Sequence, residues 1–236
     1  MAAERGYFVT GTDTEIGKTI VSAALIRALN RRGRRTVGMK PVASGCIETA
    51  DGLRNEDAVA LMNAAAADCP YEDVNPYAFV PPIAPHIAAD EAGVSIEFGR
   101  VQECHERLAA AADCVVVEGV GGWTVPLNAD QSVADLAVAL DLPVVLVVGM
   151  RLGCLNHALL TAESMRRAGV RCAGWVANDL DGAMGRLKEN VATLQRMMPF
   201  PMIARVPVLR DPDKAEIEFD LTDPLPQGEG RVRGVD

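Results

Sequence analysis

Two short runs of almost purely β-branched residues constrain the fold of this chain most strongly. They are Cys114–Glu118 (C-V-V-V-E) and residues 143–148 (P-V-V-L-V-V). Neither run alternates with polar residues, as a strand with one solvated face would, so both strands are expected to be buried on both faces. Strands of this kind occur in parallel sheets whose two faces are covered by helices.

The rest of the chain continues this alternation of strands and helices. Further strand-length segments are residues 7–10, 36–40, 170–176 and 202–206, and helical spacing marks 17–31, 55–67, 86–92, 97–112, 156–168 and 183–198. The Pro- and Asn-rich residues 69–85 read as a loop. The pattern predicts an α/β fold with a doubly wound, mostly parallel sheet and helices on both faces.

The domain organisation follows from the same pattern. No internal repeat and no linker interrupts it, so a single domain is expected over residues 1–236. The polar, Pro- and Gly-rich segment from about residue 211 to 236 is expected to be a flexible tail.

Composition excludes several kinds of partner. With 32 acidic and 23 basic residues the net charge is −9, which argues against nucleic-acid binding. The basic residues 27–35 could form a nucleic-acid patch, but at a helix end such a cluster commonly faces the helix dipole and solvent. The longest apolar stretch, 142–150, is shorter than the roughly 20 residues that span a membrane. Six scattered cysteines without a C-x-x-C pair, and an N-terminus without a signal-peptide pattern, predict a cytoplasmic protein.

The strongest functional motif is V-T-G-T-D-T-E-I-G-K-T-I, residues 9–20, between the first predicted strand and helix. Gly17, Lys18 and Thr19 match the end of a P-loop, in which backbone N–H groups cradle phosphates, the Lys reaches the outer phosphates and the Thr hydroxyl meets Mg²⁺. Gly11 and Gly17 are separated by one residue more than the usual pattern. The strand–loop–helix context nevertheless predicts a P-loop NTPase type of fold.

Three further side chains are candidates for the same edge of the sheet. Glu118 ends a buried strand, where ligands bind in such sheets, and a carboxylate there suits Mg²⁺, although a solvated acid is the plain alternative. Asp57 lies near a helix start, where Asp is commonly a cap. Lys40 follows the second strand and is a candidate cation for phosphoryl charge, although an isolated Lys there is more often solvated. No serine or cysteine has a base at triad spacing, so no hydrolase triad is predicted.

Several sequence blocks together carry a resemblance to a known family. They are G-T-D-T-E-I-G-K-T, K-P-V-A-S-G, G-L-R-N-E-D-A, V-N-P-Y, P-H-I, V-E-G-V-G-G-W, P-V-V-L-V-V-G-M-R-L-G-C-L-N-H and G-W-V-A-N-D. In this order, from about residue 7 to 209, the chain resembles the dethiobiotin synthetases of the biotin pathway. The long P-loop is that family's pattern too.

The resemblance implies an ATP-dependent ligase. Such enzymes convert 7,8-diaminopelargonate, CO₂ and ATP to dethiobiotin, ADP and phosphate. One amine captures CO₂ as a carbamate, the carbamate takes the γ-phosphate, and the second amine closes the ureido ring. The implied cofactor is Mg²⁺, and the implied partners are these substrates and a second subunit of a homodimer.

The resemblance also implies roles for individual residues. Lys18 and Lys40 are the implied catalytic cations, and Thr19, Asp57 and Glu118 the implied Mg²⁺ ligands. Implied nucleotide contacts are Glu15, Ile16, Gly17, Lys18, Thr19, Ile20, Glu118, Gly119, Val120, Gly121, Asn178, Asp179, Pro207, Val208 and Leu209. Implied substrate contacts are Thr14, Ser44, Gly153, Cys154 and Asn156.

Alternatives remain for the nucleotide and for the class of protein. Asn178 and Asp181 fit the N-x-x-D motif of GTPases, but Asp179 replaces the Lys of that motif, which favours ATP. A dimeric switch ATPase of the chromosome-partitioning type would carry a Lys near the P-loop start, where this chain has G-T-D-T. A cobyric-acid-type amidotransferase would need a glutamine-hydrolysing domain, for which no length remains.

The segment 151–156 (R-L-G-C-L-N) is the expected site for the substrate carboxylate, contributed by the neighbouring subunit. It leaves a strand and enters a helix expected to start near Asn156, so its N–H groups should form an anion site with Asn156 as the cap. An ordinary strand-to-helix turn is the alternative on local sequence alone, and the family resemblance favours the interface site.

Overall fold

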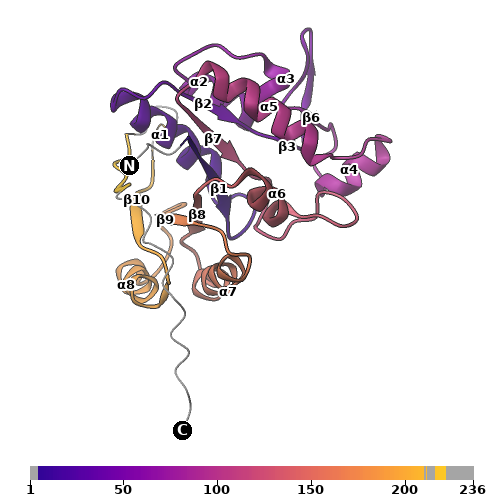
Figure 1. Ribbon diagram of the computed structural model, residues 1–236. Coiled ribbons are helices and arrows are strands. Elements are labelled where there is room, and N and C mark those ends of the chain that lie inside the picture. The colour runs from indigo at the N-terminus through magenta and orange to yellow at the C-terminus, as the bar shows by residue number, and fades with distance from the viewer. Residues whose placement is uncertain (1–4, 210, 212–215, 222–236) are drawn as a thin grey trace.

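A six-stranded, fully parallel sheet forms the centre of the computed structural model, which describes residues 5–209, 211 and 216–221 (Figure 1). The strand order is β10-β9-β8-β1-β7-β2, and every neighbouring pair runs parallel. The bounds are β1 Gly6–Gly11, β2 Thr36–Met39, β7 Cys114–Glu118, β8 Val144–Gly149, β9 Cys172–Asn178 and β10 Met202–Val206. The sheet confirms the predicted doubly wound α/β class.

Both faces of the sheet are buried, as the β-branched runs predicted. In β7, Val115 and Val117 pack into one apolar core, while Val116 points to the opposite face and packs into a second core. Helix α1 supplies apolar residues to the second core, and α5, α6, α7 and α8 supply the first. The helices are α1 Lys18–Arg31, α2 Glu56–Ala64, α3 Tyr71–Val74, α4 Pro85–Glu91, α5 Phe98–Ala111, α6 Val133–Leu140, α7 Cys154–Arg167 and α8 Leu187–Met197.

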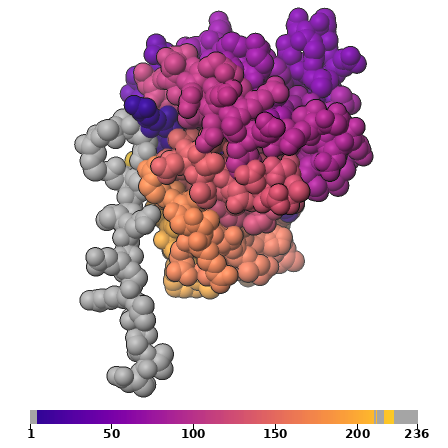
Figure 2. Space-filling model, turned by 45° about the vertical axis from the view of Figure 1, so that its right-hand side comes forward, coloured from indigo at the N-terminus to yellow at the C-terminus, as the bar shows by residue number. Residues whose placement is uncertain are grey.

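Several short elements were not predicted from the sequence. β3 (Val42–Ala43) pairs with β6 (Tyr77–Ala78), and β4 (Ile47–Thr49) and β5 (Gly52–Arg54) form a hairpin that projects from the body (Figure 2). Helix α3 lies within the segment expected to be a loop. Helix α6 was also missed, although Ser132 and Asp135 form a capping box at its start, which is a recognisable sequence signal. Strands of two or three residues carry too few side chains to show a period.

The described part of the expected flexible tail, residues 216–221, packs against the domain. Ile217 and Phe219 are buried in the second core, with Phe219 only 2% exposed. Arg32 donates to the Phe219 carbonyl at 2.7 Å, and the Asp220 N–H donates to the Ile203 carbonyl at 2.8 Å. The Pro and Gly content of the segment concealed these two apolar anchors. The remainder of that segment, apart from residue 211, lies outside the described residues.

We expect Phe219→Ala to lower the free energy of unfolding by about 3 kcal/mol, because it empties a buried aromatic site. Urea unfolding measures the change. The matched control is Glu218→Ala, whose exposed side chain points away from the core and whose loss should matter by less than about 0.5 kcal/mol. Equal small effects of the two substitutions would show that the segment does not dock.

None of the helices in the described ranges combines the length and apolar character required to cross a bilayer.

Candidate active site

A cavity of about 980 Å³ opens at the carboxyl edge of the sheet. This is the edge where ligands bind in open parallel sheets, near the strand at which the winding reverses direction. The cavity is lined by Thr14, Glu15, Gly17, Lys18, Thr19, Ile20, Lys40, Ala43, Ser44, Asn55, Asp57, Pro82, Ile83, Ala84, Pro85, Glu118, Val120, Gly121, Val125, Asn178, Asp179, Leu180, Pro207 and Leu209.

The P-loop joins β1 to α1 and leaves the N-terminus of α1 without a side-chain cap. Gly17 is the N-cap residue and has φ 82°, a left-handed conformation that favours glycine. A Cβ atom at this position would overlap the Asn178 side-chain nitrogen, so a larger residue would displace that side chain as well as strain the left-handed backbone. The free N–H groups and the positive end of the helix dipole make this turn an anion site. Glu15 also has positive φ, 57°, which bends the loop around that site.

Thr19, in the first turn of α1, lies beside two carboxylates that come from distant parts of the chain. Its hydroxyl oxygen is 2.7 Å from Asp57 Oδ1 and 2.9 Å from Glu118 Oε1. Asp57 is in the first turn of α2, and Glu118 is the last residue of β7. Glu118 is fully buried, and its Oε2 has no hydrogen-bond partner among the described residues.

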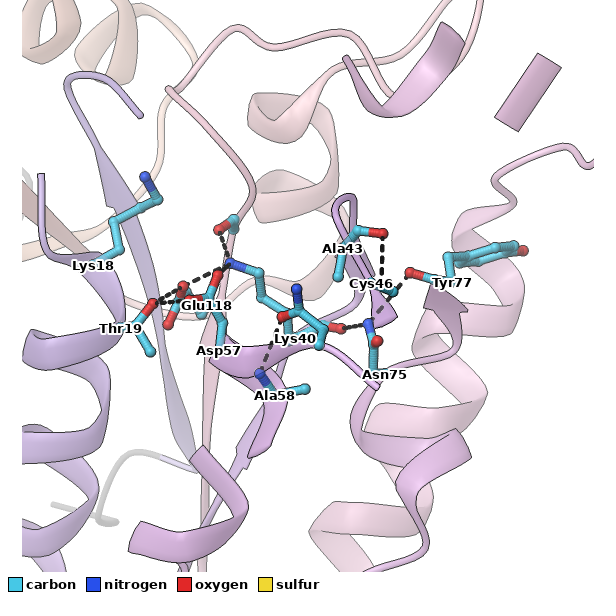
Figure 3. Close-up of polar contacts among 12 residues, drawn as sticks. Lys18, Thr19, Lys40, Ala43, Cys46, Asp57, Ala58, Asn75, Tyr77 and Glu118 are labelled. Atoms are coloured by element: carbon cyan, nitrogen blue, oxygen red, sulfur yellow. Dashed lines mark hydrogen bonds and ion pairs between the residues drawn. The ribbon is translucent and has the colours of Figure 1, made fainter. Parts of the chain in front are cut away.

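Lys40 completes this cluster from the end of β2 (Figure 3). Its ammonium lies 2.6 Å from Glu118 Oε1, 2.7 Å from Asp57 Oδ2 and 3.3 Å from the Gly119 carbonyl. Burial opposes the charge of Lys40, but the Glu118 and Asp57 carboxylates more than offset it and raise the pKa of Lys40 above its ordinary value. Burial also opposes the charge of Asp57, and the nearby Lys40 ammonium prevails and lowers the pKa of Asp57.

Lys18 points toward the same cavity from the P-loop. Its ammonium donates to the Asp13 carbonyl at 2.9 Å. Burial, and after it the neighbouring charge of Lys40, lowers the pKa of Lys18 from 10.5 to about 8. At neutral pH the group is therefore still charged, but it is held in surroundings that offer little solvation. A poorly solvated cation of this kind forms strong charge-assisted hydrogen bonds with an anionic ligand.

The arrangement fits a hard divalent cation. The Asp57 and Glu118 carboxylates both contact the Thr19 hydroxyl, and the buried Glu118 Oε2 has no partner among the described residues. Hydroxyl and carboxylate oxygens are the ligands that Mg²⁺ selects. Within the described residues no group of three or more His, Cys, Asp or Glu side chains could hold a metal. The cluster therefore suits an ion that takes its other ligands from phosphates and water.

Most of the nucleotide residues named from the sequence line the cavity, and three do not. Asn178, at the end of β9, donates to the Ile16 carbonyl at 2.7 Å and so ties this strand to the P-loop. Ile16 itself is buried beneath the loop, Val208 is 49% exposed, and Gly119 presents only its carbonyl to Lys40.

The substrate residues named from the sequence fall into two groups. Thr14 and Ser44 line the cavity, and the Ser44 hydroxyl has no partner among the described residues although it is buried. Gly153, Cys154 and Asn156 do not line it within this chain.

The segment 151–156 differs in detail from the prediction. Helix α7 begins at Cys154, and Gly153, with φ 97°, is its N-cap. The prediction that Asn156 caps this helix is wrong, because Asn156 lies exposed within the first turn. The Cys154 side chain is buried in the core, so only its backbone could meet a ligand. Leu152 is 99% exposed, and Arg151 pairs with Asp13 of the P-loop.

Sequence reasoning missed a group of uncharged residues on the cavity wall. They are Ala43, Asn55, Pro82, Ile83, Ala84, Pro85, Val125 and Leu180. Most have no chemical signature of their own and reach the cavity through loop geometry. Asn55 was detectable, since Asn before an acidic helix start is an N-cap signal, and its side chain accepts from the Ala58 N–H.

Comparisons with known sequences agree with this geometry. A family model described as an AAA domain matches residues 5–216. The ATP-dependent dethiobiotin synthetase BioD of Pseudomonas aeruginosa (strain UCBPP-PA14) is 54% identical over 216 residues, 91% of this chain and 95% of that protein. The protein of the same name from Xanthomonas axonopodis pv. citri (strain 306) is 51% identical over 201 residues, 85% of this chain and 90% of that protein.

Solved structures share the fold at low identity. A ParA family ATPase from Chlorobium tepidum TLS has a TM-score of 0.55 and 16% identity, covering 89% of this chain and 86% of that one. The septum site-determining protein MinD from Pyrococcus horikoshii OT3, complexed with Mg-ADP, has a TM-score of 0.53 and 17% identity, covering 88% of this chain and 82% of that one.

These two kinds of likeness carry different weight. Identity below a fifth shows the P-loop NTPase fold alone, so the switch-ATPase alternative rests only on a shared architecture. Identity above a half over nine tenths of the chain, and over 95% of the relative, shows the family itself. The chain therefore belongs to the AAA-domain family whose sequence model matches residues 5–216, and to the ATP-dependent dethiobiotin synthetases.

Proposed function

We propose that the cavity carries out the ATP-dependent carboxylation and ring closure of 7,8-diaminopelargonate, giving dethiobiotin, ADP and phosphate. The observation that carries the proposal is the meeting of a P-loop, two buried lysines and two carboxylates on one cavity. The reaction forms two C–N bonds and one transient C–O–P linkage. It needs positioning and charge neutralisation rather than a protein nucleophile.

The nucleotide end of the cavity is the P-loop side. Backbone N–H groups at the start of α1 and the Lys18 ammonium are suited to the β- and γ-phosphates. The walls near Asn178, Asp179, Pro207 and Leu209 are suited to the base. Lys18 must then exchange the Asp13 carbonyl for phosphate oxygens, which are stronger acceptors.

Thr19, Asp57 and Glu118 would hold Mg²⁺ beside the phosphates. When bound, Mg²⁺ supplies positive charge against the β- and γ-phosphate oxygens during transfer. Lys40, which now neutralises both carboxylates, is then available to the carbamate oxygens at the centre of the cavity. In that position Lys40 holds the carbamate, which is a weak anionic nucleophile, against the anionic γ-phosphoryl group.

The reaction proceeds in three steps. The first amine attacks CO₂ and loses a proton, giving the carbamate. A carbamate oxygen attacks the γ-phosphorus, and the bond to the ADP oxygen breaks. The second amine then attacks the carbamoyl carbon and loses a proton to solvent, which closes the ring as the bond to phosphate breaks and phosphate leaves. Lys18 and Lys40 stabilise the charge that moves between these oxygens.

The diamine is proposed to lie against Thr14 and Ser44. The buried, unpartnered hydroxyl of Ser44 is suited to an amine or carbamate at that position. We also propose a homodimer in which residues 151–156 of one subunit hold the substrate carboxylate of the other. The exposed Leu152 and the uncapped N-terminus of α7 at Gly153 support this arrangement. A crystal structure with substrate, in which the carboxylate is held only within its own subunit, would contradict it.

The cytoplasm is the proposed location. The six cysteines are scattered along the sequence and include no C-x-x-C pair, a usage that is typical of a reducing compartment. Neither a nucleic acid nor a membrane is proposed as a partner, since the chain carries a net charge of −9.

The direct test is product formation with each substrate omitted in turn. Purified protein with the diamine, bicarbonate, Mg²⁺ and ATP should release ADP and phosphate in equal amounts and form dethiobiotin, identified by mass spectrometry. Release of phosphate that is independent of the diamine would instead indicate an ATPase.

ATP is expected to bind more tightly than GTP. The Asp179 carboxylate accepts from the Gly182 N–H at 3.1 Å and replaces the lysine of the GTPase motif, so the pattern for guanine is incomplete. Competition against a fluorescent adenine nucleotide measures the order. A GTP affinity equal to or above that of ATP would reverse this assignment.

Glu118→Gln is expected to raise the Mg²⁺ concentration needed for half-maximal activity by at least about tenfold, because it removes one of two carboxylate ligands. The Mg²⁺ dependence of turnover measures the shift. Glu189→Gln is the matched control, since that exposed glutamate lies in α8, outside the cavity. An unchanged Mg²⁺ requirement in Glu118→Gln would remove Glu118 from the metal site.

A further inference from the structure

The hydroxyl of Tyr71, in α3, lies between the two segments that carry Lys40 and Asp57. The Asn55 N–H donates to this hydroxyl at 2.8 Å, and the hydroxyl donates to Asn75 Oδ1 at 3.0 Å. Tyr71 does not line the cavity, so it takes no direct part in the chemistry described above.

One side of this bridge holds the backbone of Lys40. The Asn75 side-chain nitrogen donates to the Lys40 carbonyl at 2.6 Å and to the Tyr77 carbonyl at 3.3 Å. The Lys40 N–H donates to the Val74 carbonyl at 2.7 Å. Asn75 is buried, so these bonds face little competition from water (Figure 3). The backbone from which the Lys40 side chain extends is therefore fixed to the segment that follows α3.

The other side holds the start of helix α2. Asn55 is the N-cap of that helix, and its Oδ1 accepts from the Ala58 N–H at 3.2 Å. Asp57 lies two residues beyond Asn55, in the first turn. The buried Asn55 uses its side chain to fix the helix and its backbone N–H to reach Tyr71. The position of Asp57 thus depends on where the Tyr71 hydroxyl lies.

The tyrosine ring is itself held in place. The Arg54 guanidinium lies over it, 4.1 Å from the ring centroid, a cation–π contact that fixes the ring independently of the hydroxyl. Tyr71 therefore presents one donor and one acceptor from a rigid support.

We propose that Tyr71 is a positioning residue that sets the spacing between Lys40 and Asp57 for phosphoryl transfer. The proposal deepens the proposed function and rests on it, since that function assigns the two side chains their roles. Without the hydroxyl, the Asn55 N–H and Asn75 Oδ1 lose their common partner, and the start of α2 can shift relative to the end of β2. Small displacements of this kind strongly affect a reaction that depends on in-line geometry.

Tyr77 offers a matched control within the same region. The Glu97 N–H donates to its hydroxyl at 2.9 Å, and the Arg100 guanidinium lies 4.8 Å from its ring centroid. Its hydroxyl touches neither the Lys40 nor the Asp57 segment. Tyr71→Phe and Tyr77→Phe thus each remove one hydrogen-bonded hydroxyl from a tyrosine that lies beneath an arginine, and only the first removes the bridge.

The first test compares kcat, the KM for ATP and the unfolding midpoint of the two variants. Tyr71→Phe should lower kcat at least about tenfold and change the KM for ATP less than about twofold, because the P-loop is untouched. Tyr77→Phe should keep kcat within about twofold and lower the unfolding midpoint as much as Tyr71→Phe does. Equal kcat in the two variants would overturn the proposal.

A double-mutant cycle separates positioning from a general loss of stability. If Tyr71 acts through Asp57, adding Tyr71→Phe to Asp57→Asn should lower kcat less than about twofold further. A full additional tenfold loss would show that the two residues act independently, and would overturn the proposal.

A structural readout keeps the inference distinct from the proposed function. In a crystal structure of Tyr71→Phe the contact between Lys40 Nζ and Asp57 Oδ2 should lengthen beyond hydrogen-bond distance, while Tyr77→Phe should retain it. A retained contact in Tyr71→Phe overturns the positioning role whatever reaction the wild type catalyses. A wild type that forms no dethiobiotin contradicts the proposed function, and this contact still decides the role of Tyr71.

Discussion

Replacing Lys40 with methionine is expected to lower kcat by about 10²–10³-fold, because it removes an oriented cation from the proposed centre of phosphoryl transfer. The Lys40 ammonium lies 2.6 Å from Glu118 Oε1 and 2.7 Å from Asp57 Oδ2, so no water layer separates them. Methionine keeps the length and the apolar stem of the side chain. Steady-state kinetics with saturating substrates measures the loss.

The same substitution should also destabilise the protein. Removal of one partner leaves Glu118 fully buried with an uncompensated charge, a situation that typically costs about 3–5 kcal/mol. The double variant Lys40→Met with Glu118→Gln should recover much of the stability and none of the turnover. Lys188→Met, on the exposed surface of α8, controls for the loss of a lysine charge. Near-normal turnover in Lys40→Met would remove Lys40 from the reaction.

Lys18→Met is expected to produce a loss of similar size, about 10²–10³-fold in kcat, together with weaker ATP binding. Lys18 lies in the P-loop, and its hydrogen bond to the Asp13 carbonyl can be exchanged for one to a phosphate oxygen. Isothermal titration with ATP and steady-state kinetics measure the two effects. Unchanged ATP affinity would place the phosphates away from Lys18.

Lys18 also predicts a pH dependence of ATP binding. Its pKa of about 8 means that the free protein loses this charge as the pH rises above about 8. Binding in chelator should therefore weaken by up to about tenfold per pH unit above that value, and stay nearly constant between about pH 7 and the pKa. The dependence should disappear in Lys18→Met and persist in Lys188→Met.

The features of the fold and the site that the sequence predicts are those governed by local patterns. The β-branched runs at 114–118 and 143–148 predicted buried parallel strands, and the P-loop predicted an anion site at the start of α1. Lys40 and Glu118 could be assigned to the same edge because both lie at the carboxyl ends of strands.

Distances and supporting contacts could not be predicted in this way. Asp57 and Glu118 lie 61 positions apart in the sequence, and no local sequence pattern around either residue shows that both contact Thr19. Tyr71 lies in a Pro-rich segment whose composition indicates a loop. Its proposed role depends on hydrogen bonds to Asn55, which precedes it in the sequence, and to Asn75, which follows it. The docking of Phe219 was concealed because the composition around it is that of a tail.

The proposed reaction uses ATP to convert a carbamate into a ureido ring. Incubation of the protein with the diamine, ¹⁴C-bicarbonate, Mg²⁺ and ATP tests it most directly, because a carbamate releases its label in acid and a ureido ring does not. The expected result is acid-stable label equal in amount to the ADP formed, none when ATP is omitted, and label formed about 10²–10³-fold more slowly by Lys40→Met. ATP consumption without acid-stable label would contradict it.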